Sequence, residues 1–265
     1  IVFSAGFGYH TYDSGSPPVI RETVYDIASL TKVLAATPVT MKLISQKKLS
    51  LDHNVAQFYP QFTRGGREDI TIRHLLIHSS GLPGYYQFFV DKNIKTKEDV
   101  LNYILNADLQ SQPSTHYEYS DLGFILLTAI IEKVSKRPID RLAHSWLYGP
   151  LAMKQTRYSP SSEWRKIIAP TEMDTVYRKR LLQGEVHDEN TYLMGGVSGH
   201  AGVFSTAEDI AKYEGRYGDG WDELRKNRHE ELKGLGVLDS KWEISPRNEN
   251  SVDWENVENK DWDSA

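Results

Sequence analysis

Apolar positions recur with helical spacing in three stretches of the chain. The first begins at Ser29 and leads to a pair of lysines at 47–48, with Pro38 as its expected kink. Its apolar positions are Leu30, Val33, Leu34, Met41, Leu43 and Ile44. The other two stretches predict helices over Lys97–Asn106 and Asp121–Val134, and the second of these is so apolar that we expect it to be buried.

Strand and turn patterns flank this helical region. The opening residues 1–19 mix β-forming residues with a Gly-Ser-Pro-Pro break, which predicts one or two strands and a loop. Residues 49–86 predict a loop, a short helix and a Gly-Pro turn. Later, a Gly-rich turn precedes a short strand at Val203 and Phe204. A helix then begins with Ser205 or Thr206 as its cap and Glu208 as the reciprocal partner.

The character of the chain changes after about residue 215. We expect one domain over residues 1–215, with a helical subdomain at roughly 50–190. Residues 216–265 are acidic, rich in Asn and Trp and poor in aliphatic side chains, so no regular element is predicted there. We interpret this segment as a surface-wrapping tail, a linker or an incomplete C-terminal part.

The composition narrows the possible functions. The 265-residue chain is 39% hydrophobic and 25% charged, which is ordinary for a globular protein. Its net charge of −5 gives no basic surface, so we expect no nucleic-acid partner. The lack of cysteine excludes disulfides, zinc–thiolate sites and a cysteine nucleophile. No apolar run approaches the ~20 residues that span a bilayer, although a membrane anchor or an export signal can have preceded Ile1.

A serine and a lysine stand three residues apart at the predicted start of the first helix, in "YDIASLTKV". A serine hydroxyl is a weak nucleophile unless a neighbouring base takes its proton. Residues i and i+3 share one helix face, so the amine of Lys32 is expected beside the hydroxyl of Ser29. Burial in an apolar helix favours the neutral amine, and the helix start offers the Ser29 N–H to a developing oxyanion.

The Ser-x-x-Lys spacing also has a structural explanation, in which Ser29 caps the helix and Lys32 is solvated. The sequence holds a second copy, Ser45 to Lys48, at a polar helix end where we expect a structural role. The spacing alone therefore does not separate a nucleophile from a capping residue.

A second group of candidates precedes the most apolar helix. In "HYEYSDLGFILL", Tyr119, Ser120 and Asp121 stand on a loop at the edge of a core element, where catalytic groups are often found. A tyrosine there can relay the proton of the serine to a leaving group, helped by a lysine charge that favours the phenolate. The alternative is a buried tyrosine with a hydrogen-bonded hydroxyl, next to Asp121 as the helix N-cap.

Several separated motifs together resemble one known family. They are "YDIASLTKV", "ITIRHLLIHSSGLP", "YEYSDLGFILLTAIIEKV" and "GEVHDENTYLMGGVSGHAGVFSTAEDIAKY". Their order and spacing are similar to the serine beta-lactamase-like family, in its branch of class C beta-lactamases, D-Ala-D-Ala carboxypeptidases and esterases related to penicillin-binding proteins. The resemblance covers roughly Gly6 to Tyr213. It implies an α/β (α+β) fold in which helices flank an antiparallel sheet and an all-helical subdomain is inserted.

Position by position, the resemblance implies a role for each candidate. Ser29 is the acylated nucleophile, Lys32 its activating partner and Tyr119 the general acid or base. Asp121 stands where the family often has asparagine, and we expect it to contact the substrate or to orient Lys32. A carboxylate cannot donate the hydrogen bond that the side-chain amide of asparagine would donate. This difference favours chemistry on esters or peptides over beta-lactam hydrolysis.

The resemblance also requires a third motif, similar to Lys-Thr-Gly or His-Thr-Gly, on a strand edge beside the serine. The nearest match is "GHAG", which makes His200 a candidate for substrate binding. The alternatives are that His200 lines the rim of the pocket or shapes the turn. No other match follows in the tail, which leaves open an incomplete enzyme or a relative without activity.

Histidines and carboxylates also raise the question of a metal. His74 and His78 lack the glutamate of a His-Glu-x-x-His pattern and are expected to be structural. His187, Asp188 and Glu189 are interpreted as a solvated or pocket-edge loop rather than a cation site. We therefore predict no metal and no cofactor.

Two functional classes follow from these observations. The first is a serine hydrolase that acts through an acyl-enzyme on a D-alanyl peptide, a small ester or a beta-lactam, so its partner is a small-molecule or peptidoglycan-derived substrate. The second is a non-catalytic binding or regulatory protein on the same scaffold, because a fold does not fix a function. Cell-wall chemistry implies a periplasmic or secreted location.

Overall fold

The computed structural model describes residues 5–213 continuously, and beyond them residues 226–227, 229–230, 233–234, 241 and 243–244. Its backbone contacts divide the chain into two units, Ile1–Lys212 and Tyr213–Ala265. All five candidate site residues lie in the first unit. Most of the segment predicted as a tail, residues 216–265, lies outside the described residues, so its interpretation stays a prediction.

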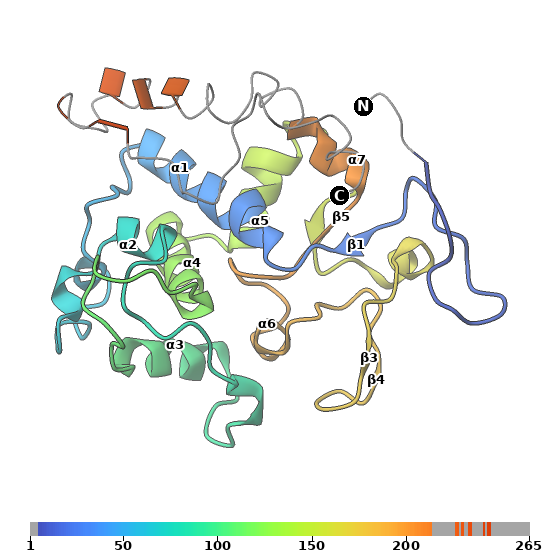
Figure 1. Cartoon of the computed structure of the whole chain (residues 1–265), viewed down its shortest axis with the longest axis horizontal. Coiled ribbons are helices and arrows are strands. Elements are labelled where there is room, and N and C mark those ends of the chain that lie inside the picture. The colour runs from blue at the N-terminus through green and yellow to red at the C-terminus, as the bar shows by residue number, and fades with distance from the viewer. Residues whose placement is uncertain are drawn as a thin grey trace. The chain divides into compact units, whose positions relative to one another are not determined.

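A three-stranded antiparallel sheet joins distant parts of the first unit. The strand order is β1 (Tyr25–Asp26), β5 (Val203–Ser205) and β2 (Arg157–Tyr158). Figure 1 labels β1 and β5 where they lie together. All three residues of β5 are buried, which fits a strand that is covered on both faces. A separate antiparallel hairpin pairs β3 (Met173–Asp174) with β4 (Arg180–Leu181).

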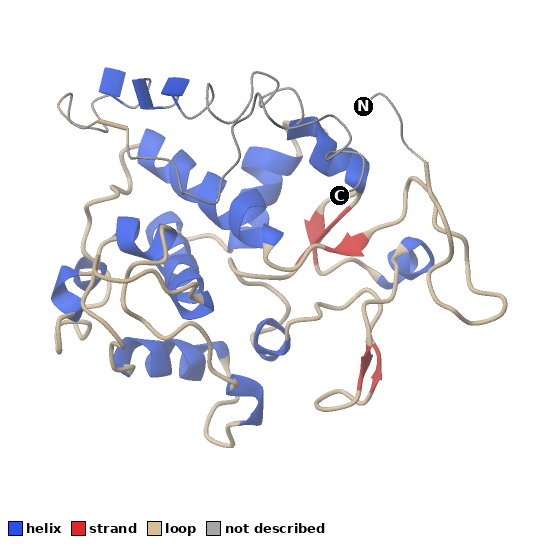
Figure 2. Cartoon of the chain, viewed as in Figure 1, coloured by secondary structure: helices blue, strands red, loops and turns tan. Residues whose placement is uncertain are grey.

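Most of the helices gather beside this sheet (Figure 2). Helix α4 (Asp121–Ser135) packs against α1 (Thr37–Ser45), α2 (Ile72–Leu76), α3 (Lys97–Asn106) and α5 (Ile139–Ala143). The ten residues of α4 that follow Asp121 are all buried, because apolar side chains surround this helix. The region predicted as a helical subdomain, roughly 50–190, holds α2 to α5 together with β2 and the β3–β4 hairpin.

Two helices lie where the sequence predicts them. Helix α3 spans the predicted residues and begins with a capping box, in which Thr96 and Asp99 each accept the backbone N–H of the other. Helix α4 exceeds its predicted range by one residue, Ser135. The shorter elements are η2 (Val55–Gln57), η3 (Arg67–Asp69), η4 (Phe88–Val90), η5 (His144–Tyr148), η6 (Ser162–Ile167), α6 (Glu189–Leu193), α7 (Ala207–Ile210) and η7 (Ala211–Tyr213). None of the helices in the described part of the chain is both long and apolar enough to cross a membrane.

The first predicted helix differs in its opening turns. Residues Lys32–Ala36 form a π-helix, η1, in which the N–H of Thr37 donates to the carbonyl of Lys32. Helix α1 follows directly with Pro38 in its first turn, and Pro38 has no N–H to donate back to the preceding turn. The helix type therefore changes just before the proline, and the kink expected at Pro38 stays a prediction.

The opening of the chain contains less β-structure than its composition predicts. Within residues 5–20, the β-type pairing is an isolated bridge between Tyr9 and Pro18, and no strand forms in that range. A bridge without neighbours lacks the ladder of hydrogen bonds that stabilises a strand.

Helix α7 begins with one of the two predicted caps. The hydroxyl of Thr206 accepts the N–H of Asp209, which identifies Thr206 rather than Ser205 as the N-cap. With Thr206 as N-cap, the third helical residue is Asp209 rather than the predicted Glu208. The carboxylate of Glu208 forms an ion pair with Arg21.

Candidate active site

Ser29 and Lys32 meet at the start of the first helical segment. Ser29 lies exposed in the turn directly before the helix, whereas Lys32 is 3% exposed. The Nζ of Lys32 donates to the Oγ of Ser29 across 3.1 Å, as the i to i+3 spacing predicts. An accessible hydroxyl is therefore in contact with a buried amine, which is the pairing that activation of a serine requires.

Three further groups surround the amine of Lys32. The Oδ1 of Asp121 lies 2.7 Å from Nζ, the carbonyl oxygen of His200 lies 3.4 Å from it, and the ring centroid of Tyr119 lies 4.5 Å from it. The contact with Asp121 is an ion pair by distance, but its angles lie outside hydrogen-bond geometry, so Oδ1 keeps an unused acceptor direction. Side chains from η1 and from the start of α4 thus meet a carbonyl that precedes β5.

The loop before α4 positions Tyr119 and Asp121 through Ser120. The hydroxyl of Ser120 accepts the N–H of Gly123 and donates to the carbonyl of Pro83. Ser120 is therefore the N-cap of α4, and the suggested capping role of Asp121 is wrong because Asp121 is already the first helical residue. Tyr119 is 45% exposed, so it is not the buried tyrosine of the alternative interpretation.

His200 reaches the site through its backbone. Its imidazole is buried, with Nδ1 2.8 Å from the Oγ of Ser198 and Nε2 3.0 Å from Asp188 and 3.1 Å from Thr191. Burial alone would raise the pKa of Asp188, but the hydrogen bond and the charge of His200 outweigh it and hold this pKa well below its ordinary value. This arrangement offers the carbonyl of His200 to Lys32, while the imidazole is engaged inside the protein. Its role in substrate binding stays a prediction, which the geometry does not favour.

A comparison with protein families identifies the family of this chain. The model of the Beta-lactamase family matches residues 1–248, which include all five candidate residues. This chain belongs to the beta-lactamase family. Family membership confirms the resemblance read from the motifs and the predicted fold, in which helices flank an antiparallel sheet.

Curated relatives of this beta-lactamase family member carry the names of cell-wall enzymes. The chain is 37% identical over 214 residues to a putative D-alanyl-D-alanine carboxypeptidase of Escherichia coli (strain K12), and 34% identical over 241 residues to N-acetylmuramyl-L-alanine amidase of Bacillus subtilis (strain 168). These matches cover 71% and 80% of the chain but 49% and 55% of the relatives. The chain therefore spans about half the length of these relatives.

Solved structures show the same fold. The octameric penicillin-binding protein homologue from Pyrococcus abyssi aligns with a TM-score of 0.65 and 29% identity, over 82% of this chain and 49% of that one. The hydrolase EstCE1, described as having promiscuous acyltransferase activity, aligns with a TM-score of 0.60 and 25% identity, over 78% of this chain and 61% of its own. Similarity thus extends to proteins with different names.

Asp26 is a site residue that the sequence reasoning did not single out. Its Oδ1 accepts the N–H of Ala28 across 2.8 Å, and its Oδ2 accepts the N–H of His187 across 2.7 Å. Burial raises the pKa of Asp26, and these two hydrogen bonds partly oppose that effect. Ala28 has a positive φ of 44°, directly before Ser29. An aspartate two residues before a turn is a known Asx-turn signal, and that signal was present in "YDIAS".

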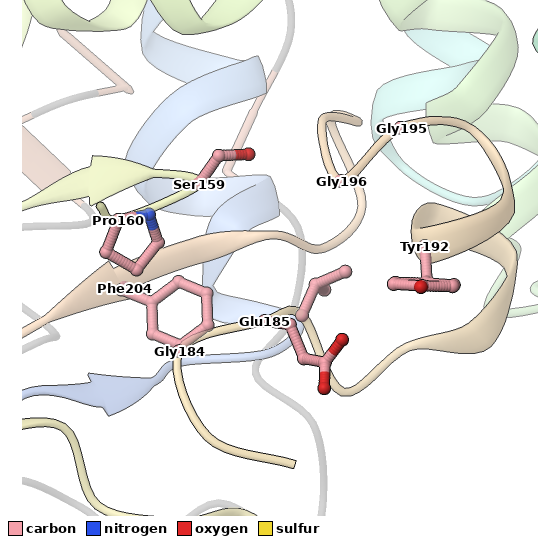
Figure 3. Close-up of a pocket in the computed structure, with 9 residues that line it drawn as sticks. Ser159, Pro160, Gly184, Glu185, Tyr192, Gly195, Gly196 and Phe204 are labelled. Carbon is pink, nitrogen blue, oxygen red and sulfur yellow. The ribbon is translucent and has the colours of Figure 1, made fainter. Parts of the chain in front are cut away.

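A cavity of about 450 Å³ lies in the same unit, but it contains none of the five predicted residues. Figure 3 shows Ser159 and Pro160 on one side of it, and Tyr192 with the Gly195–Gly196 turn on the other. The carboxylate of Glu185, also on its wall, forms an ion pair with Arg180. The cavity is therefore distinct from the constellation at Lys32.

The histidines considered as metal ligands have other partners. The Nε2 of His187 lies 3.0 Å from a carboxylate oxygen of Glu172, and the Nε2 of His74 lies 2.8 Å from the hydroxyl of Ser114. Within the described residues, no three His, Asp or Glu side chains gather as a metal site would require.

Proposed function

We propose that this chain carries a serine hydrolase activity that acts on an amide or ester carbonyl through an acyl-enzyme. The observation that carries the proposal is the position of the Lys32 amine, 3.1 Å from the Ser29 hydroxyl and 2.7 Å from the Asp121 carboxylate. The family and the names of the relatives support a hydrolase of this type. The assignment of Ser29, Lys32, Tyr119 and Asp121 to roles is part of the proposal.

In the first half of the reaction, the Oγ of Ser29 attacks the carbonyl carbon while its proton passes to the amine of Lys32. The Ser29 N–H at the helix start stabilises the negative oxygen that forms. Tyr119, next to Lys32, then donates a proton to the leaving amine or alcohol and regains one from Lys32. The bond from the carbonyl carbon to the leaving group breaks, and an ester to Ser29 remains.

In the second half, water attacks the ester. The proton of that water passes through Tyr119 or Lys32 to the departing Oγ of Ser29, which restores the hydroxyl and releases a carboxylic acid. Asp121 orients the ammonium form of Lys32, since opposite charges at 2.7 Å attract strongly in a buried site. The imidazole of His200 has no step in this scheme.

We propose a D-alanyl peptide derived from peptidoglycan as the substrate, with a small ester as the alternative. Names of the relatives, a carboxypeptidase and an amidase, support the peptide. The description of EstCE1 as a hydrolase with promiscuous acyltransferase activity supports acyl transfer in general. A beta-lactam fits less well, because Asp121 cannot donate the hydrogen bond that an asparagine would supply. A cell-wall substrate would place the protein outside the cytoplasmic membrane.

Intact-mass spectrometry after incubation with a fluorophosphonate, and separately with a penicillin, tests the nucleophile. We expect one covalent adduct on the wild type and none on Ser29→Ala. The chain supplies a matched control, because Ser45→Ala removes the serine of the second Ser-x-x-Lys copy, whose hydroxyl donates to the carbonyl of Lys42. This control should label like the wild type.

The outcomes separate the functional classes. An adduct that survives Ser29→Ala would place the nucleophile elsewhere. A folded wild type that reacts with neither reagent would contradict the hydrolase and favour the binding or regulatory protein. Release of D-alanine from an acylated D-Ala-D-Ala peptide, compared with hydrolysis of p-nitrophenyl acetate, then decides between peptide and ester.

A further inference from the structure

His78 lies against the proposed acid–base residue. It follows α2 in a left-handed backbone conformation, with φ at 57°, which is uncommon for a residue other than glycine. Its ring packs against those of Tyr119 and Phe124 in tilted arrangements, at centroid distances of 4.5 and 5.1 Å and interplanar angles of 32° and 30°. The ring of Tyr117 meets it edge-on at 5.9 Å. Three aromatic rings thus pack against the imidazole.

His78 accepts two hydrogen bonds from the backbone on either side of Tyr119. The carbonyl of His78 accepts the N–H of Glu118 across 2.9 Å, and its Nδ1 accepts the N–H of Ser120 across 2.9 Å. These donors are the residues immediately before and after Tyr119. His78 therefore fixes the backbone on both sides of the tyrosine while its ring fixes the phenol ring.

The bond to Ser120 requires a neutral imidazole. A nitrogen that accepts a backbone N–H carries no proton, so the remaining proton is on Nε2. Burial and the nearby charge of Lys32 lower the pKa of His78, and Asp121 partly opposes them. A second proton would remove the acceptor for Ser120 and add a cation next to Lys32.

We infer that His78 is a positioning residue for Tyr119: it holds the phenol against the Lys32 amine, and it does so only in its neutral form with the proton on Nε2. This inference rests on the proposed function, because it presumes that Tyr119 transfers a proton. It adds a residue to the site and predicts that protonation of His78 suppresses acylation at acidic pH.

A double-mutant cycle on the rate of Ser29 labelling by a fluorophosphonate tests the inference. We expect His78→Asn to lower the rate about 10- to 100-fold, since a displacement of about 1 Å can cost ~100-fold in rate. Asparagine tolerates the left-handed conformation but lacks the ring. In a Tyr119→Phe background the same change should cost less than about twofold, because both changes remove one function. In His78→Asn, the part of the fall in labelling rate at acidic pH that comes from protonation of His78 should also disappear.

His74→Asn is the matched control. Its Nδ1 also accepts a backbone N–H, that of Thr71 at 3.2 Å, but its described contacts do not include Tyr119. This variant should label at close to the wild-type rate. Nitrogen-15 NMR of the wild type provides a measurement that needs no variant: at neutral pH the Nδ1 of His78 should be unprotonated and Nε2 protonated.

The possible results are distinct. An equal loss from His78→Asn in both backgrounds, with the wild type labelled, would overturn the positioning role and leave the proposed function intact. A proton on Nδ1 at neutral pH would overturn it as well, even if the variants failed to fold. A wild type that is not labelled at all would overturn the proposed function and this inference with it.

Discussion

Replacing Asp121 by asparagine removes one charge of the buried ion pair but nearly keeps the size and shape of the side chain. The side chains of Lys32 and Asp121 are 4% and 19% exposed, and their charged atoms are 2.7 Å apart. At an effective dielectric constant of about 20, such charges attract by roughly 6 kcal/mol. Much of this attraction offsets the cost of removing both groups from water, but deleting one partner leaves the other charge buried and unpaired, which costs about 3–5 kcal/mol.

We expect Asp121→Asn to lower the free energy of unfolding by about 3 kcal/mol at pH 7, near the low end of that range because Asp121 is partly exposed. The lost interaction of its carboxylate with the N-terminal end of α4 accounts for at most about 1 kcal/mol of this. Urea denaturation of both proteins at pH 7 measures the effect.

Asp52→Asn is the control, because it makes the same chemical change in an exposed pair. Asp52 lies 3.0 Å from Arg73 and its side chain is 78% exposed, so the loss should be about 0–1 kcal/mol. A destabilisation no larger than that of Asp52→Asn would refute the coupling of Lys32 and Asp121.

Two further changes test the parts that support the site. Thr128→Val should cost about 1–3 kcal/mol of unfolding free energy in urea, because the Thr128 hydroxyl accepts the buried N–H of Gly199 at 2.8 Å. Thr40→Val, whose hydroxyl donates to a helical carbonyl, should cost less, and an equal cost would refute the argument. The hydrogen bond from Arg178 holds the pKa of Asp174 well below its usual range, so the stability it contributes is present above about pH 4 and is lost as pH falls. The loss in free energy of unfolding caused by Asp174→Asn, measured in urea, should therefore be smaller at pH 3 than at pH 7. An equal loss at both pH values would contradict the stabilising role of the Asp174 carboxylate.

The elements that local signals specify could be predicted. Helix α3 has its capping box at Thr96 and Asp99, and α4 is apolar on all sides, so their predicted ranges agree with the structure to within one residue. The first helix was less predictable. Its apolar spacing does not distinguish buried positions from Val33 and Met41, which are 57% and 64% exposed. Burial depends on which elements pack nearby, and the spacing carries no information about them.

The supporting residues of the site show the same limit. Asp26 stands in the quoted motif "YDIAS", yet its second hydrogen bond goes to His187, which follows the β3–β4 hairpin. His78 was expected to be structural, and its contacts with Tyr119 depend on a turn that brings the residues after α2 against the loop before α4. A sequence pattern can include such residues but does not predict their tertiary contacts, because the contacting residues come from separate elements.

By itself, the sequence determined the pairing of Ser29 with Lys32, because residues three apart on a helical turn share a face whatever surrounds them. It also indicated the family, which the match of the family model over residues 1–248 confirms. Only the tertiary structure decided what surrounds the amine. The Asp121 carboxylate arrives on α4, and the His200 carbonyl comes from 168 residues further along the chain. Contacts of this range form when strands pair and helices pack, and hydrophobic burial over the whole unit drives that packing.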